Sequence, residues 1–421
     1  MRIIIIRKIF RIFNTLNVRR LDNNNNTYNT INTTRPMRFK IEKKDFNAAF
    51  TTLMKLAGHS TVRVVEAALK KNVLRLSATD AKNTLRLDVL CESEDEGTLL
   101  LDGPRFWPVL KELPDGPVTV TVGDVAVNVD WDRGNCQFPV SVYDEFPPLP
   151  KIGASPDTPI RTLILDRGVI DDVVAGVIPA TADENDFQPI LGCVYFDIEG
   201  QNVTVVGTDA QMLLTREASV RGLDDEKFSF LVPKSAIAAL ALAMPADADT
   251  VTIHCDGKIL SCSGEGFRLV SLCVDKAYPA YRTVMTAGGG GRLTVDRKDL
   301  ISAVRRVAAL TSARDEKDTV SLSLTGGIGA TAEVQAQNLA DFSSVKETLQ
   351  CEWDGEAMTI GFKVQRLLAI LGSTAAERVT FQITAPDQRV MFLPEGDEDA
   401  KGMIMPAPVR AFVDPPKRKK K

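Results

Sequence analysis

Histidine is nearly absent from this chain of 421 residues, in which only His59 and His254 occur. Because histidine is the commonest general base and a frequent metal ligand, its scarcity argues against most acid–base and metal-site chemistry. The seven cysteines are scattered, odd in number and contain no CxxC pair. This pattern indicates reduced thiols in the cytoplasm rather than a disulfide framework or a zinc site. We therefore expect no metal and no cofactor.

Long apolar runs and catalytic motifs are also missing. No run of about 18 apolar residues exists, so no membrane-spanning segment is expected. GxSxG, HExxH and the Walker glycine loop are absent. The run Gly288–Gly291 lacks the following Lys-Ser/Thr of a phosphate-binding loop and is interpreted as a flexible joint. An enzyme with an unrecognised active site and a β-rich scaffold remain as alternatives to the function inferred below.

Charge is distributed unevenly along the chain. The whole sequence has 51 basic and 55 acidic residues, but residues 1–36 hold seven basic and one acidic, and Lys417–Lys421 adds five basic. The remaining body carries a net charge of −15. Such a body argues against adhesion to nucleic acid over its whole surface, while a local basic face remains possible.

Residues 1–36 differ in composition from everything after them. MRIIIIRKIFRIF is apolar and basic, and NNNNTYNTINTT is low-complexity polar sequence. The segment could be an Arg-rich targeting peptide, a disordered leader or an upstream extension of the reading frame. We favour the leader or extension, because the Ile, Asn and Arg bias resembles translated AT-rich DNA. Met37 is then the natural start.

From Met37 onward, one pattern of helices and strands occurs three times. The phrases LSATDAKNTLRL and VVGTDAQMLLTRE lie 129 residues apart, and strand–helix openings at Ile41, Leu165 and Val295 align without gaps. The second helices are predicted to begin at Leu101, Leu231 and Ile360. This period indicates three complete α+β domains, each with two helices and about eight antiparallel strands. We expect the domains at 37–158, 159–286 and 287–412, followed by a basic tail at 413–421.

The repeated Thr-Asp pairs and one helix are the most informative local features. Asp80 and Asp209 occupy equivalent positions and predict short Asx-type turns rather than a catalytic acid pair. Asp45 is expected to cap the first helix.

The helix that opens the third domain buries one face and exposes Lys298 and Arg305 on the other. Small residues between these bases leave a flat surface for a phosphate backbone, although a plain amphipathic helix is the alternative. The residues expected to contact DNA are Lys44, Lys55, Lys111, Lys234, Lys298, Arg305, Arg306, Lys363 and Arg366.

Several phrases, in order and at matching spacing, carry a family resemblance. They are ATDA and GTDA followed by Leu, FPPLP, LVPKSAI, YPAYRTVM and MPAPVR, within a stretch from Met37 to about Arg410. On these phrases the chain resembles the beta subunit of bacterial DNA polymerase III, the sliding clamp of replication. Basic helices inside an acidic ring would also reconcile the charge distribution.

The resemblance implies three DNA-clamp domains, each with two helices packed on antiparallel sheet. Two chains would join head to tail in a homodimeric ring of six domains around double-stranded DNA, with Leu310 at the interface between copies. Such a ring binds DNA without sequence preference and gives processivity without catalysis of its own. The implied partners are a DNA polymerase catalytic subunit, other replication and repair proteins and a clamp loader, in the cytoplasm and not at a membrane.

The family also has an apolar cleft between the second and third domains, which takes short peptides with Gln and Leu or Phe anchors. The matching positions are Ile190, Thr208, Ala210, Gln211, Met212, Leu213, Pro279, Thr283, Val284, Met405, Pro406, Val409 and Arg410. The terminal MPAPVR can be aligned with the family through Met405-Pro406 or through Ala407-Pro408. This chain departs from the family in its basic tail after that motif, in second-domain helices that are poor in Lys and Arg, and at two places in the cleft. Ala210-Gln211-Met212 stands where Gly-His-Arg is common, and Thr283 stands where an Arg is frequent.

Overall fold

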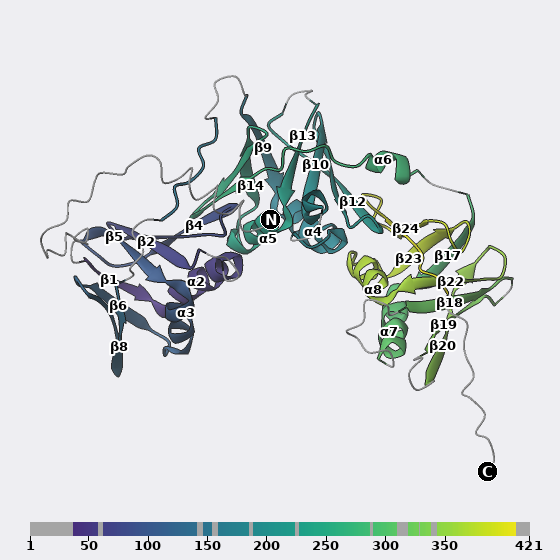
Figure 1. The fold of residues 1–421 in the computed structure, drawn as a ribbon, viewed down its shortest axis with the longest axis horizontal. Helices are drawn as coiled ribbons and strands as arrows, with labels where there is room; N and C mark the ends of the chain where they lie inside the picture. The colour runs from purple at the N-terminus through teal and green to yellow at the C-terminus, as the bar shows by residue number, and fades with distance from the viewer. Residues whose placement is uncertain are drawn as a thin grey trace, which may run out of the picture.

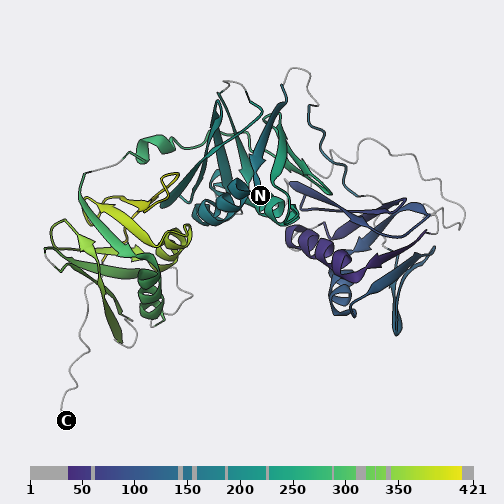
Figure 2. The ribbon, with the colours of Figure 1, turned by 180° about the vertical axis from the view of Figure 1, so that it is seen from behind.

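Three similar units form an arc with helices on its concave side and sheets on its convex side (Figures 1 and 2). The computed structural model describes residues 37–57, 62–140, 146–153, 159–184, 188–223, 227–286, 289–309, 319–327, 329–337 and 343–409. Within these residues, each unit has two long helices packed on antiparallel strands, which confirms the expected fold class. The leader, the basic tail, Leu310 and Arg410 lie outside the described residues.

The elements follow the same order in each unit. The first unit contains β1 (Met37–Glu42), α2 (Lys43–Ala57), β2 (Val64–Lys70), β3 (Val73–Thr79), β4 (Asn83–Leu90), β5 (Glu96–Asp102), α3 (Gly103–Glu112), β6 (Pro117–Val122), β7 (Ala126–Trp131) and β8 (Gly134–Pro139).

The second unit contains β9 (Arg161–Asp166), α4 (Arg167–Gly176), η1 (Ile178–Ala180), η2 (Pro189–Gly192), β10 (Cys193–Glu199), β11 (Asn202–Thr208), β12 (Met212–Ser219), β13 (Lys227–Pro233), α5 (Lys234–Ala243), β14 (Thr250–Cys255), β15 (Ile259–Gly264), β16 (Phe267–Leu272) and α6 (Tyr281–Val284).

The third unit contains β17 (Gly291–Asp296), α7 (Arg297–Ala308), β18 (Thr319–Thr325), β19 (Thr331–Gln337), β20 (Ser344–Gln350), β21 (Glu352–Trp353), β22 (Met358–Lys363), α8 (Val364–Gly372), β23 (Arg378–Ile383), β24 (Val390–Pro394) and β25 (Ala400–Ile404). Among the described residues, β21 has no counterpart in the other units.

The sheets extend across the boundaries between units. The order β5-β2-β3-β4-β16-β15-β14-β9 makes one sheet from the first and second units, through pairing of β4 with β16. The order β13-β10-β11-β12-β25-β24-β23-β17-β21 joins the second and third units in the same way, through β12 and β25. Two four-stranded sheets, β1-β6-β7-β8 and β20-β19-β18-β22, lie at the two ends of the arc.

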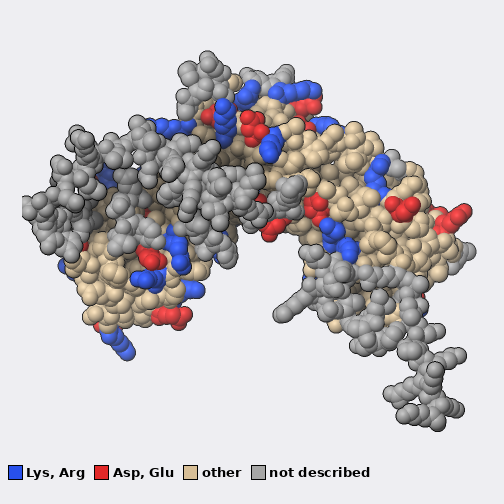
Figure 3. All heavy atoms as spheres, in the orientation of Figure 1, with Lys and Arg blue, Asp and Glu red and all other residues tan. Residues whose placement is uncertain are grey.

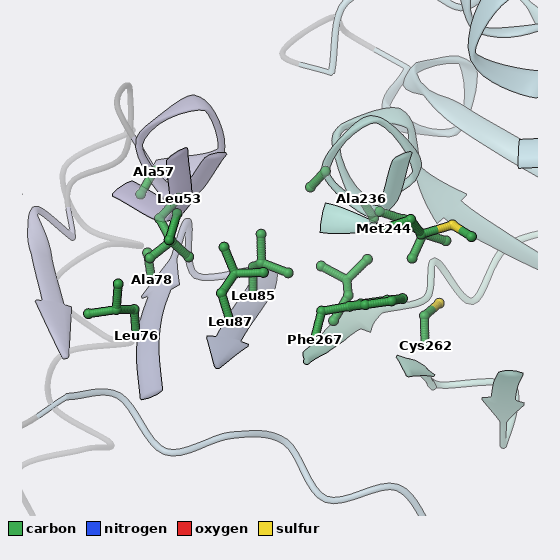
Figure 4. Packing of buried hydrophobic residues seen from close by; sticks show 14 of the residues in the cluster. Leu53, Ala57, Leu76, Ala78, Leu85, Leu87, Ala236, Met244, Cys262 and Phe267 are labelled. Carbon is green, nitrogen blue, oxygen red and sulfur yellow. The ribbon is translucent and has the colours of Figure 1, made fainter. Parts of the chain in front are cut away.

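The hydrophobic core also crosses the first boundary. Buried residues of the first and second units form one apolar cluster, in which Leu85 and Leu87 of β4 lie between Leu53 of α2 and Phe267 of β16 (Figure 4). A second cluster around α7 and α8 of the third unit also includes Ala180, Met212 and Leu214 of the second unit. Fully burying a Leu or Phe side chain contributes ~2 kcal/mol, so these clusters hold the helices to the sheets.

The second helix of each unit begins later than predicted. Strands β5, β13 and β22 extend two to four residues into the segments predicted to start at Leu101, Leu231 and Ile360. In each unit the strand runs into the helix without a loop, so the change of period falls inside one uninterrupted stretch of regular structure. Asp45 likewise lies in the first turn of α2 and does not precede it, because the helix begins at Lys43.

The two Thr-Asp turns are alike at the level of single hydrogen bonds. The carboxylate of Asp209 accepts the N–H groups two and three residues later at 2.8 and 2.6 Å, and that of Asp80 does so at 2.9 and 2.6 Å. These are the predicted Asx turns. Both turns place an alanine in the left-handed region, with φ of 76° at Ala81 and 68° at Ala210.

A left-handed conformation costs an alanine about 1–2 kcal/mol, and glycine avoids this penalty. We predict that Ala210→Gly raises the free energy of unfolding by up to about 1 kcal/mol, measured by denaturant titration. Ala48→Gly, at an exposed position inside α2, is the matched control and should lower it by ~0.5–1 kcal/mol. A loss of stability in both variants would contradict the strain assigned to this turn.

Candidate functional site

The predicted cleft falls where the second and third units meet. Strand β12 pairs antiparallel with β25, from Met212 opposite Ile404 to Arg216 opposite Ala400. One further bond, from the Met405 N–H to the Gln211 carbonyl at 2.8 Å, extends this pairing into the Thr-Asp turn. The turn and the C-terminal segment are therefore held side by side by backbone bonds.

Two ion pairs cross the same joint, and a third pair within the second unit supports one of them. Arg216 binds Asp397 of the third unit at 2.6 Å and Asp172 of α4 at 2.7 Å. Burial alone would lower the pKa of Arg216, but its hydrogen bond to Asp397 and the charge of Asp172 raise that pKa above its ordinary value. Asp209 binds Arg366 of α8 at 2.8 Å. Because the side chains of Arg216 and Asp397, and of Asp209 and Arg366, are at most 33% exposed, these two pairs fix the orientation of the two units.

Alternate residues of β12 face opposite sides of the shared sheet. Met212 and Leu214 point into the core of the third unit, whereas Leu213 joins a separate apolar group, here called the joint cluster. Its buried members are Val206, Leu213, Tyr281, Met391 and Met403, and its partly exposed members are Tyr195, Tyr278, Val284, Met285 and Met405. Figure 1 shows α6, which contributes to this cluster, on the convex side of the joint.

Aromatic rings stiffen one side of the joint cluster. Tyr195 and Tyr278 stack with ring centroids 4.5 Å apart and planes 11° apart. The Tyr281 hydroxyl donates to the Asp197 carboxylate at 2.7 Å, and Arg282 binds the same oxygen at 2.8 Å. Burial and then the bond to Asp197 raise the pKa of Tyr281 above its ordinary value. These contacts attach α6 to β10 and leave apolar surface of Val284 partly exposed.

The structure brings together only part of the predicted cleft set. Leu213, Val284 and Met405 meet in the joint cluster. The side chain of Met212 is 2% exposed and packs on the face of the sheet opposite to Leu213, because successive residues of a strand alternate. Thr208 is buried and its hydroxyl donates to the Met212 carbonyl at 2.7 Å, which is a structural role within the turn.

The remaining predicted residues differ in exposure. Ala210, Gln211, Pro279, Thr283 and Val409 are exposed, and Ile190 and Pro406 are half-buried. The C-terminal segment leaves the cluster after Met405, because the Ala407 N–H donates to the Gly361 carbonyl of β22 at 2.7 Å.

Seven members of the joint cluster were not predicted from sequence, namely Tyr195, Val206, Tyr278, Tyr281, Met285, Met391 and Met403. Four of them lie in strands β10, β11, β24 and β25, which carry buried apolar residues on both faces. A strand that is apolar on both faces packs against something on each side.

The concave face consists of one layer of helices. Contacts between neighbours give the order α3, α2, α5, α4, α8, α7 along the arc. Of the residues predicted to contact DNA, Lys44, Lys55, Lys298 and Arg305 are exposed on this layer. Figure 3 shows Lys and Arg interspersed with Asp and Glu on the visible surface rather than gathered in one patch.

The other basic residues predicted to contact DNA already have partners in the protein. Lys234 donates to the Ala182 carbonyl at 2.7 Å, and the Arg366 guanidinium binds Asp209. Arg306 forms a two-pronged pair with Glu347, one bond of which is 2.8 Å. The Lys111 amine lies 4.0 Å from the centre of the Trp107 ring. Lys363 is half-buried at the end of β22. Sequence patterns place a basic residue on a helix face but do not show which acid or carbonyl it meets.

Two further observations concern the described part of the chain. It contains no group of three or more His, Cys, Asp or Glu residues arranged to hold a metal ion. No helix in that part is long and apolar enough to cross a membrane.

Two models of one protein family match consecutive stretches of the chain. The central domain of the DNA polymerase III beta subunit matches residues 166–280, and its C-terminal domain matches residues 282–408. The chain belongs to this family. These matches cover the β12–β25 joint, so the joint cluster lies where two domains of a beta subunit meet.

Full-length relatives support the assignment. The beta sliding clamp of Vibrio cholerae is 24% identical over 380 residues, covering 89% of this chain and all of that protein. The beta sliding clamp of Synechocystis is 24% identical over 364 residues, covering 82% of this chain and 90% of the relative.

Solved structures show the same fold. The Bacillus subtilis DNA polymerase sliding clamp aligns with a TM-score of 0.77 at 16% identity, over 89% of this chain and all of that one. The Pseudomonas aeruginosa DNA polymerase III beta subunit aligns with a TM-score of 0.76 at 21% identity, over 88% of this chain and all of that one.

Proposed function

We propose that two copies of this chain close head to tail into a ring around duplex DNA and tether replication proteins to it, without catalysing a reaction. The observation that carries the proposal is the repetition of one sheet joint. Strand β4 pairs with β16, and β12 pairs with β25. In the repeat, β20 is the counterpart of β4 and β12, and β8 is the counterpart of β16 and β25.

Strands β20 and β8 are the outer strands of the two terminal sheets. Such edges present unpaired backbone groups and attract another strand. Val345 on β20, and Cys136 and Phe138 on β8, pack only partly against their own cores. An edge of this kind at each end of an arc fits a head-to-tail contact, which closes into a ring when the rotation per copy is suitable.

The internal joints also give a register for this contact. Val345 lies opposite Ala336 as Leu85 lies opposite Ala78, and Cys136 lies opposite Val129 as Leu269 lies opposite Cys262. Since Leu85 faces Leu269 across the first joint, Val345 of one copy would face Cys136 of the other. The Leu85–Leu269 pair falls between hydrogen-bonded pairs, where the side chains of opposite strands come closest.

The arc supplies the rest of the mechanism. Its concave helical layer would line the hole, where exposed Lys and Arg contact phosphates without reading bases. Topology rather than affinity would retain the ring, so weak and salt-sensitive contacts suffice and permit sliding. A clamp loader would be needed to open the ring, and a polymerase peptide would bind the joint cluster with apolar anchors.

The register predicts a specific cross-link between copies. Val345→Cys should form a disulfide with Cys136 of the second copy under mild oxidation by a thiol–disulfide reagent, because a non-hydrogen-bonded cross-strand pair has suitable geometry. The product is a covalent dimer on a non-reducing gel, mapped by mass spectrometry. Val345→Cys combined with Cys136→Ser is the control and should give no such product. Cross-linking of the control to the same extent would refute this register.

Topological binding predicts dependence on DNA ends. Rings assembled on nicked circular duplex, with a loader or by reassembly of opened rings, should stay bound through gel filtration and be lost after a restriction enzyme linearises the circle. Blocking both ends of the linear duplex with a bulky protein should restore retention. Equal retention on circular and open linear DNA would rule out an encircling ring.

Substitutions on the two faces of the joint should affect stability and partner binding separately. Val284→Lys, at a half-exposed position, should change the unfolding free energy by less than about 1 kcal/mol. It should nevertheless reduce binding of a synthetic pentapeptide with Gln, Leu and Phe anchors at least about tenfold in fluorescence anisotropy. Met212→Lys should instead cost at least about 3 kcal/mol, because it buries a charge in the third core. Undiminished peptide binding by Val284→Lys would place the site elsewhere.

A further inference from the structure

Exposed positive charge is concentrated at the two ends of the helical layer. Lys44 and Lys55 on α2 are exposed at one end, and Lys298 and Arg305 on α7 are exposed at the other. None of these four makes an ion pair within the described residues. Acidic neighbours such as Asp45 and Asp299 lie in the first turns of these helices, where they favour the helix dipole.

The middle of the layer, formed by α5, α4 and α8, has a different surface. Arg167 donates to the Met244 carbonyl at 3.1 Å and binds Asp171 at 3.2 Å. Lys234 is bound to the Ala182 carbonyl, and Arg366 is bound to Asp209. The basic groups in these helices are therefore held by the protein itself.

The exposed side chains of the middle helices include acidic and apolar groups. The side chains of Asp171 and Asp172 are 52% and 49% exposed, although each contacts an arginine, and Leu242 of α5 is 45% exposed. A phosphate backbone approaching this surface loses solvation of its charge and finds no fully exposed Lys or Arg among the described residues of these three helices. Salt screens charges over ~8 Å under physiological conditions. The basic residues at the ends of the layer therefore compensate only weakly for the solvation that the phosphates lose in the middle.

We propose that duplex DNA contacts this ring in two opposite sectors only, each centred on an interface between copies, and does not contact the second unit. This inference rests on the proposed ring. In a head-to-tail ring the third unit of one copy adjoins the first unit of the other. Helix α7 of one copy and helices α2 and α3 of its neighbour would thus form one basic sector.

Each sector combines basic residues from both copies, which couples DNA binding to dimerisation. Without DNA, like charges from two copies converge at the interface and repel one another. Phosphates that bind there relieve this repulsion and bridge the copies. By linkage, DNA must then increase the affinity of the copies for one another by the same factor by which dimerisation increases DNA binding.

Site-specific photo-cross-linking tests where DNA touches the ring. A benzophenone amino acid is placed at exposed Ala48 of α2, at exposed Ala309 after α7 or at Leu242 of α5, in rings assembled on nicked circular duplex. We expect DNA adducts at positions 48 and 309 to exceed those at position 242 at least about tenfold. Comparable adducts at position 242 would overturn the inference. Adducts at none of the positions would also overturn it, and loss of DNA retention as well would implicate the ring itself.

Salt dependence gives an independent measurement. Lys298→Ala or Arg305→Ala should each reduce the slope of log binding constant against log salt by about 1, because each removes one phosphate contact. Asp171→Asn on α4 is the matched control and should leave the slope and the affinity unchanged. An affinity gain with Asp171→Asn as large as the loss with Lys298→Ala would show that DNA reaches the second unit. Thermal unfolding of every variant verifies that the fold is retained.

Discussion

Pairing of strands at sheet edges is the contact on which the rest of this molecule depends. β4 with β16 and β12 with β25 each align two units through backbone hydrogen bonds, so that the two long helices of every unit fall on the same side of the arc. Backbone bonding places few demands on side chains beyond alternation. This explains how the fold persists with a TM-score of 0.77 against the Bacillus subtilis clamp at only 16% identity. The side chains at each joint are then free to differ, as Arg216 with its two acids does at the second joint.

The sequence predicted the architecture well because the repeat supplied independent copies of each signal. The Thr-Asp turns, the helix faces and the strand order recur at a nearly constant interval, so an ambiguous segment in one unit was resolved by its equivalents. The exact starts of the second helices were not predictable in this way. All three units run from strand to helix without a loop, and the three copies therefore shared the same error.

The functional surfaces were less predictable, because they depend on contacts between segments far apart in the chain. Leu213 and Val284 lie in the joint cluster, whereas the side chain of Met212 packs on the other face of its strand. Likewise, Arg306 and Arg366 have the helix positions of DNA-binding residues, but Glu347 and Asp209 engage them. Neither acid lies near its partner in sequence, so no helical or strand period could reveal the pairing. The family resemblance supplied the position of the joint but not the tyrosines that line it.

The two internal joints differ from the proposed joint between copies in connectivity. Within one chain, the segment between β8 and β9 and that between β16 and β17 tether the units, so each internal joint forms at an effective concentration set by its linker. In the proposed ring, the joint between β20 and β8 would have no tether and would form at the concentration of free protein. The missing tether would add an entropic cost that neither internal joint carries. Dilution would then separate the copies before it separates the units, and the untethered edge would be the place where the ring opens for DNA.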